Sequence, residues 1–174
     1  MAASVRGGGG VEYVFSENTE NASLDVQTLS GYSPTAEILI KVDAGVYLWS
    51  SNTSVGGLTI TGAQSGNTVK IENSGLIMGM GGDAGTNTSV NGKNGGPGLV
   101  LAYPFELTNT PSGYIGGGGG GGGHGVFGSA AGGGGGGAGG GNTYRATTLV
   151  QNGGAIGQSG GNGTSGGTTA SGGG

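Results

Sequence analysis

Apolar and polar residues alternate over short stretches in the first half of the chain. Val11, Tyr13 and Phe15 recur at every second position, which is the period of a half-buried strand. Similar stretches, rich in β-branched side chains and separated by Gly, Asn and Ser, follow at 38–42, 46–49, 58–60, 69–71, 99–103 and 105–107. Short strands of this kind are typical of a β-solenoid or a small β-sandwich. No stretch has a helical period, and each glycine in a helix costs ~1 kcal/mol, so we expect an all-β chain.

One phrase occurs three times along the chain. It consists of an asparagine, a short spacer, Gly-x-Ile or a near variant, and then a burst of glycine, and the copies are 69–82, 105–123 and 149–157. Asn109 follows Asn73 by 36 residues, and Asn152 follows Asn109 by 43. A loose period of this size is typical of solenoids and repeat arrays. The sequence therefore predicts a rod of stacked short strands with glycine-rich excursions.

The change in composition along the chain indicates three regions. We expect residues 1–35 to be an N-terminal lead used for attachment, residues 36–82 to be a short-strand β region, and residues 83–174 to be a glycine-rich repeat region. The last residues, 171–174, read Ser-Gly-Gly-Gly. Because this ending is open, we expect more chain beyond Gly174.

The composition argues against several classes of protein. Glycine accounts for 50 of the 174 residues, and charged residues make up 8% against a usual ~25%. The net charge is only −4, unlike that of most disordered chains, and five scattered basic residues do not form a nucleic-acid footprint. There is no cysteine for disulfides. No apolar run approaches ~20 residues, so we expect no membrane insertion, and residues 1–7 do not read as a secretory signal.

Three structures can be considered for the glycine run 116–123. A flexible linker is favoured by the entropic cost of ordering glycine. Collagen requires strict Gly-X-Y and abundant proline, which the run lacks. A polyglycine-II-type helix is extended, with three residues per turn, and without side chains such helices can approach and hydrogen-bond to one another. We favour a bundle of these helices after the strands, because apolar segments flank the run on both sides, at 114–115 and 144–150.

The sequence carries no enzyme motif. His124 is the only histidine, so neither a histidine metal cluster nor a positioned triad is indicated. Gly92-Lys93-Asn94 fails as a phosphate loop, because no Ser or Thr and no helix follow the lysine. We therefore expect no catalytic residue, no metal and no cofactor. Solvated or structural roles are expected for Asp43, Glu72, Asp83 and Glu106.

Large side chains beside the glycine runs are the candidates for contact with a partner. His124, Val126 and Phe127 form an island between two runs, where nothing local would bury them. Tyr114 and Tyr144 flank the runs. Because aromatic side chains dominate many binding sites, we expect receptor contacts from these five residues. The alternative for the two tyrosines is that they cap the ends of glycine helices.

A family resemblance follows from these motifs. Gly-Gly-Pro-Gly-Leu-Val-Leu at 95–101, then Asn109, Gly-Tyr-Ile at 113–115 and a polyglycine run resemble the glycine-rich segments of tail-fibre and tail-tip proteins of tailed bacteriophages. The resemblance implies an extracellular virion protein of the phage tail that acts in host-cell surface recognition and attachment. It implies other phage tail proteins as partners, together with a bacterial outer-membrane protein or surface glycan. By resemblance, loops between packed glycine helices touch the bacterial surface. Because a rigid scaffold carries function on its loops, we expect the contacts here from 124–131 and 83–94.

Two other functions fit parts of the sequence. A purely structural tail or fibre shaft segment of the virion would use the same repeats without contacting the host. An ice-binding protein would display regular threonine faces on a glycine-helix bundle. The available threonines do not keep a spacing of three, which argues against ice binding: 143, 147, 148, 164, 168 and 169.

The chain is also expected to self-associate. Its apolar stretches are short and widely spaced, so they look unable to bury a core alone, and repeat units need neighbours to stack upon. Because the resembling proteins are often trimeric, we expect a homotrimer.

Overall fold

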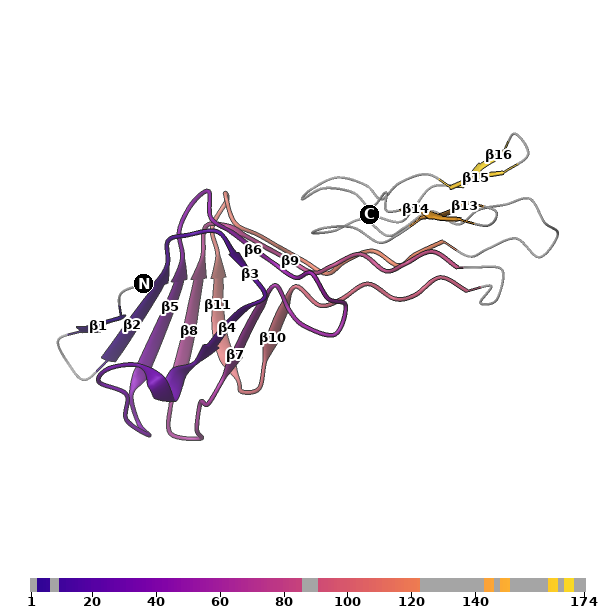
Figure 1. The fold of residues 1–174 in the computed structure, drawn as a ribbon. Coiled ribbons are helices and arrows are strands. Elements are labelled where there is room, and N and C mark those ends of the chain that lie inside the picture. Colours follow the sequence, from indigo (N-terminus) through magenta and orange to yellow (C-terminus); the bar gives the residue numbers. More distant parts are fainter. Residues whose placement is uncertain are drawn as a thin grey trace.

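Successive strands of the chain enter three sheets in turn in the computed structural model (Figure 1). The structure describes residues 3–6, 10–85 and 91–122, and further along the chain the backbone of four short strands, 143–145, 148–150, 163–165 and 168–170. Three strands and their corners make one turn, after which the chain returns to the first sheet.

The strands are grouped by turn as follows. β1 (Ala3–Arg6) precedes the first full turn, which consists of β2 (Gly10–Phe15), β3 (Thr19–Glu20), β4 (Ala22–Asp25) and the 3-10 turn η1 (Val26–Thr28). The second turn is β5 (Glu37–Val42), β6 (Tyr47–Trp49) and β7 (Leu58–Thr61), and the third is β8 (Thr68–Asn73), β9 (Leu76–Met78) and β10 (Leu99–Leu101). β11 (Phe105–Asn109) and β12 (Tyr114–Gly116) begin a fourth turn.

Each sheet collects one strand from every turn. Sheet A has the order β1-β2-β5-β8-β11, sheet B the order β3-β6-β9-β12 and sheet C the order β4-β7-β10. All neighbours in these sheets are parallel except β1 and β2. This arrangement is a parallel β-solenoid, so the topology distinguishes between the two expected architectures. The all-β prediction is confirmed, since the three-residue η1 is the only helix in the part of the chain that the structure describes.

Further along, two short hairpins carry the remaining described strands. β13 (Thr143–Arg145) pairs antiparallel with β14 (Thr148–Val150), and β15 (Gly163–Ser165) pairs antiparallel with β16 (Thr168–Ala170).

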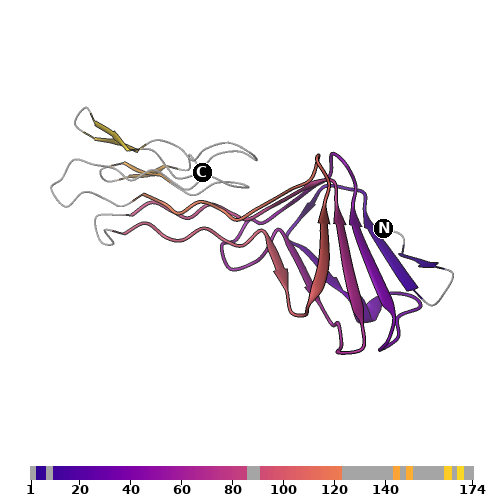
Figure 2. The same cartoon turned by 180° about the vertical axis from the view of Figure 1, so that it is seen from behind.

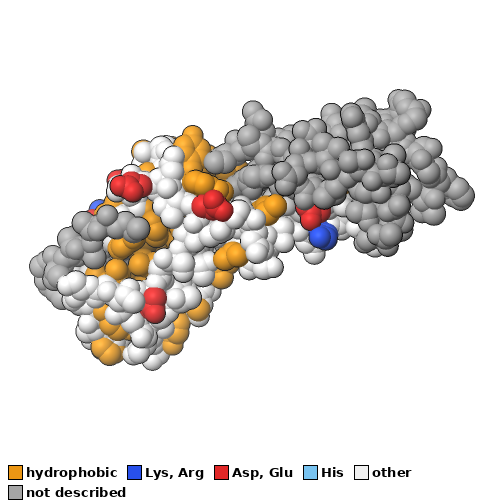
Figure 3. Space-filling model, in the orientation of Figure 1, with side chains coloured by type: hydrophobic (Ala, Val, Ile, Leu, Met, Phe, Trp, Pro, Cys, Tyr) orange, Lys and Arg blue, Asp and Glu red, His pale blue; other side chains and the backbone are white. Residues whose placement is uncertain are grey.

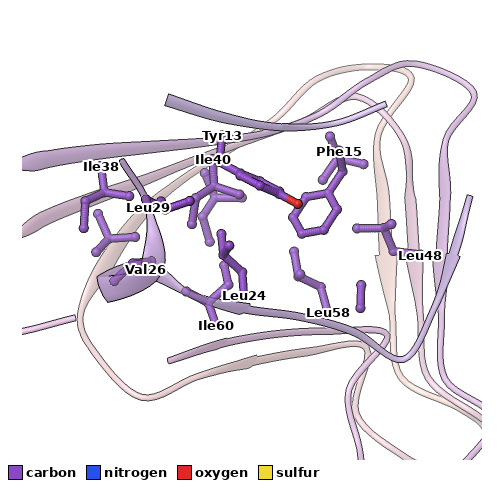
Figure 4. Packing of buried hydrophobic residues seen from close by; sticks show 14 of the residues in the cluster. Tyr13, Phe15, Leu24, Val26, Leu29, Ile38, Ile40, Leu48, Leu58 and Ile60 are labelled. Atoms are coloured by element: carbon purple, nitrogen blue, oxygen red, sulfur yellow. The ribbon is translucent and has the colours of Figure 1, made fainter. Parts of the chain in front are cut away.

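Inward-facing side chains of the three sheets share one core (Figure 4). The alternation seen in the sequence places Val11, Tyr13 and Phe15 on the inner face of β2. The rings of Tyr13 and Phe15 pack edge to face, with their centroids 4.9 Å apart. Burial raises the pKa of the Tyr13 hydroxyl above its ordinary value. The fully buried aliphatic side chains come from all three sheets: Ile38, Ile40, Leu48, Leu58, Ile71 and Ile77.

This core forms within one chain. Each turn stacks on the next, so the turns supply the neighbours that short apolar stretches need. The expectation that the apolar stretches cannot bury a core without a second chain is therefore wrong. Core residues also come from both sides of residue 36, where the sequence indicated a boundary.

The glycine of the repeated phrase lets the backbone pass close to the neighbouring turn. A Cβ on Gly75 would lie 2.5 Å from the carbonyl oxygen of Val46, and a Cβ on Gly113 would overlap the carbonyl oxygen of Asn73. Glycine at this corner therefore follows from packing between turns. The first two copies of the repeat noticed in the sequence are successive solenoid corners between sheets A and B. The third copy, at 149–157, lies almost wholly outside the described residues.

Candidate functional site

Three glycine-rich stretches run side by side away from the solenoid (Figures 1 and 2). We call residues 79–85, 91–98 and 116–122 the glycine segments. The first follows β9, the second leads back into β10, and the third follows β12. They replace the corner between sheets B and C with a long excursion from the third and fourth turns.

Hydrogen bonds join the glycine segments at every third residue. Segment 79–85 donates backbone N–H groups to carbonyls of 116–122: Gly79 to Gly116 at 2.9 Å, Gly82 to Gly119 at 2.9 Å and Gly85 to Gly122 at 2.8 Å. Segment 91–98 donates to 79–85: Lys93 to Asp83 at 2.8 Å and Gly96 to Met80 at 2.7 Å. Segment 116–122 donates to 91–98: Gly118 to Gly96 at 2.8 Å and Gly121 to Lys93 at 2.9 Å.

This network differs from a β ladder. Side chains on a strand repeat every two residues, whereas the donors of each glycine segment repeat every three. Each segment donates to one neighbour and accepts from another, so the three close a ring of backbone pairing. Backbone hydrogen bonds therefore supply the cohesion that side chains supply in the solenoid.

The positions that face a neighbouring segment have no room for a side chain. A Cβ on Gly82, Gly95, Gly118 or Gly121 would overlap a backbone carbonyl oxygen of the adjacent segment. Gly120 is different, because the nearest atom to its Cβ would be the Lys93 carbonyl oxygen at 3.8 Å. Glycine is thus required at 82, 95, 118 and 121, whereas position 120 has room for a Cβ.

One ion pair crosses the glycine segments. Lys93 Nζ lies 3.1 Å from Asp83 Oδ2, and the two backbones are also hydrogen-bonded. The Lys93 side chain is 71% exposed, so solvent screens the pair and its contribution to stability is small.

The candidate contact residues fall in different places. Tyr114 lies on β12, 54% exposed, and its ring lies against Gly116 where the third glycine segment starts. Tyr144 belongs to β13, of which only the backbone is described. His124, Val126 and Phe127 lie outside the described residues. The chain passes out of the described part at residues 85 and 122, both at the end of the glycine segments away from the solenoid, and re-enters at 91.

Sequence reasoning missed a group of exposed apolar residues on the fourth turn. Tyr103, Phe105 and Leu107 are between 38% and 43% exposed. Figure 3 shows apolar side chains reaching the surface of the solenoid in several separate places. The pattern of 105–107 resembles that of 69–71, where Val69 and Ile71 are buried, so no sequence signal distinguishes the open side chains from the covered ones.

The described residues contain no group of three His, Cys, Asp or Glu side chains that could hold a metal. No helix in the same part of the chain is long and apolar enough to cross a membrane.

A model of one protein family matches nearly the whole chain. The family is described as phage tail fibre adhesin Gp38, and the match covers residues 10–174. No curated protein and no solved structure matches the chain.

Proposed function

Because the chain belongs to the phage tail fibre adhesin family described as Gp38, we propose that its glycine segments are the base of a polyglycine-II-type bundle that presents receptor-contacting residues to the host. The family places the chain in the virion tail, outside the cell, where it acts in host-cell surface recognition and attachment. Binding, not catalysis, is the activity that this role requires.

The observation that carries the bundle proposal is the three-residue spacing of the hydrogen bonds. A polyglycine-II-type helix has three residues per turn and no internal hydrogen bonds, so its N–H and C=O groups point to neighbours. The bonds from Gly79, Gly82 and Gly85 fit this geometry. A flexible linker gives no reason for such a spacing.

Receptor contacts are proposed at the far end of this bundle. His124, Val126 and Phe127 follow the third glycine segment directly, and 83–94 comprises the end of the first segment, residues 86–90 and the start of the second. A rigid scaffold with binding residues on its connecting loops is a common arrangement. The receptor is a bacterial outer-membrane protein or a surface glycan. For Tyr114 the ring contact with Gly116 supports the end-cap alternative, and Tyr144 remains a proposed contact.

A competition assay tests this proposal. Purified wild-type chain should block phage adsorption to host cells. The double substitution His124→Ala and Phe127→Ala should abolish blocking and leave the melting curve unchanged. Tyr103→Ala is the matched control, because Tyr103 is an exposed aromatic residue between β10 and β11 of the solenoid. Blocking by the double variant at wild-type level would reject the contact assignment, and failure of the wild-type chain to adsorb would favour the shaft alternative.

We also propose the homotrimer, on the resemblance alone. The solenoid core does not require it, because one chain buries that core. Equilibrium sedimentation of the full chain at micromolar concentration measures the state. A folded monomer would reject the trimer and leave the proposed bundle intact.

A further inference from the structure

The solenoid is open at its last strand in sheet A. Phe105 and Leu107 of β11 stand beside Val69 and Ile71 of β8 in register. The two β8 side chains are 3% and 0% exposed, whereas Phe105 is 41% and Leu107 43% exposed. The β11 residues therefore occupy core positions of a turn on which no described strand of the chain is stacked. Figure 2 shows β11 from the side opposite to Figure 1.

The outer backbone edge of β11 is open as well. β11 is the last strand of sheet A, and no strand in the described part of the chain pairs with its outer edge. An edge with apolar side chains and unpaired backbone groups is a template for addition of another strand.

An equivalent surface elsewhere in the same sheet shows what covers such an edge. β2 presents Val11, Glu12 and Tyr13, an apolar–Glu–apolar sequence like Phe105, Glu106 and Leu107 of β11. β5 covers β2 in parallel with the sequence Ile38-Leu39-Ile40-Lys41, an apolar–x–apolar–basic pattern. Lys41 Nζ lies 3.2 Å from Glu12 Oε1.

The pairing of a lysine with a carboxylate on the neighbouring strand recurs on the outer face of sheet A between β5, β8 and β11. Lys70 of β8 lies 3.2 Å from Glu37 of β5 and 4.0 Å from Glu106 of β11. Each lysine thus bridges a carboxylate on the strand before it and one on the strand after it. Within the residues that the structure describes, Glu106 has a lysine on its β8 side only, and its side chain is 72% exposed.

We propose that the outer edge of β11 binds an extended strand of another polypeptide, added in parallel, with the pattern apolar–x–apolar–basic. Its apolar side chains cover Phe105 and Leu107, as Ile38 and Ile40 cover Val11 and Tyr13. Its basic side chain stands opposite Thr108 and pairs with Glu106, as Lys41 pairs with Glu12. The surface is separate from the glycine segments, so the inference does not depend on the proposed receptor contacts.

A second copy of the chain is a less suitable occupant. The edge strand β1 reads Ala3-Ser4-Val5-Arg6 and has the required pattern, at the opposite edge of the same sheet. Joining β1 of one copy to β11 of the next is a head-to-tail contact, which extends into a fibre unless the rotation between copies closes a ring. A strand from another polypeptide covers the edge of β11 without starting such a series of copies.

The test uses a fluorescent peptide with the sequence of residues 36–43, which contains the β5 strand, and the full chain. Fluorescence anisotropy should show saturable binding. Changing the lysine of the peptide to glutamate should weaken binding roughly fivefold, because opposite charges become like charges. Glu106→Lys in the protein should restore binding of the glutamate peptide. Glu20→Lys, an exposed carboxylate on β3, is the control and should restore nothing.

Three outcomes would overturn the proposal. The first is no binding of the peptide, or binding that Phe105→Ser with Leu107→Ser does not weaken. The second is that binding changes neither when the lysine of the peptide becomes glutamate nor when Glu106→Lys is made in the protein. The third is concentration-dependent association of the wild-type chain that Leu107→Lys abolishes, which would assign the edge to a second copy. Rescue by the Glu106→Lys variant shows that this variant is folded, so the charge test does not depend on a loss of binding alone.

Discussion

Asn73 Nδ2 donates a hydrogen bond to Oδ1 of Asn109, one turn further along the solenoid, at 2.7 Å. Asn73 is fully buried, and its side chain also donates to the Tyr114 carbonyl oxygen at 3.3 Å and accepts from the Gly75 N–H at 3.2 Å. The side chain therefore ties the corner between sheets A and B to the corner above it. This contact explains why asparagine opens the repeated phrase.

Asn73→Asp should destabilise the solenoid. The carboxylate oxygen that replaces Nδ2 would face two acceptors, and a buried charge with the Gly75 N–H as its donor on the other oxygen is still costly, so the expected loss is about 3 kcal/mol of unfolding free energy. Asn109→Ala, at an exposed position of the same contact, should cost about 1 kcal/mol. Urea denaturation followed by circular dichroism measures both. Equal losses for the two variants would show that the buried asparagine has no special role.

A comparison between β8 and β11 tests whether sheet A is open at β11. Ile71 and Leu107 occupy equivalent positions on neighbouring strands, but only Ile71 is buried. Ile71→Ala should cost about 3 kcal/mol because it leaves a cavity, whereas Leu107→Ala should cost less than about 1 kcal/mol. The comparison is made by urea denaturation of the full chain. A large loss at Leu107 would mean that the last turn is covered in solution.

Much of the solenoid could be predicted from the sequence, and its pairing could not. Period-two alternation at 11–15 marked a strand, and the spacing from Asn73 to Asn109 marked one turn. The sequence did not distinguish a solenoid from a sandwich, because both use short alternating strands. The polar composition of 1–35 also hid that β2 and β4 supply core residues, since only every second side chain faces inward.

The candidate site was less accessible to sequence reasoning. Which glycines face a neighbour depends on the register between segments far apart in the chain, as for Gly118 beside Met80 and Gly96. A run of identical residues carries no register. The exposure of Phe105 has a similar cause, because its residue type fits a covered turn and an uncovered one equally well.

Alanine substitutions in the third glycine segment should separate the two classes of glycine. Gly118→Ala or Gly121→Ala places a Cβ on a neighbouring carbonyl oxygen and should lower the melting temperature of the glycine segments by several degrees. Gly120→Ala adds the same atom in open space, and it should be neutral or slightly stabilising because alanine restricts the unfolded chain. Differential scanning calorimetry of the three variants gives the comparison. The same melting behaviour at 118, 120 and 121 would contradict the packing described for these segments.

Amide hydrogen exchange within the third glycine segment tests the central claim most directly. If backbone pairing holds the glycine segments together, the N–H groups of Gly118 and Gly121, which donate to Gly96 and Lys93, should exchange slowly. The N–H groups of Gly119 and Gly120, which lie between these two residues, should exchange faster, so protection should repeat every three residues in NMR spectra of the full chain. Uniformly fast exchange from 116 to 122 would show a flexible linker and would contradict the account.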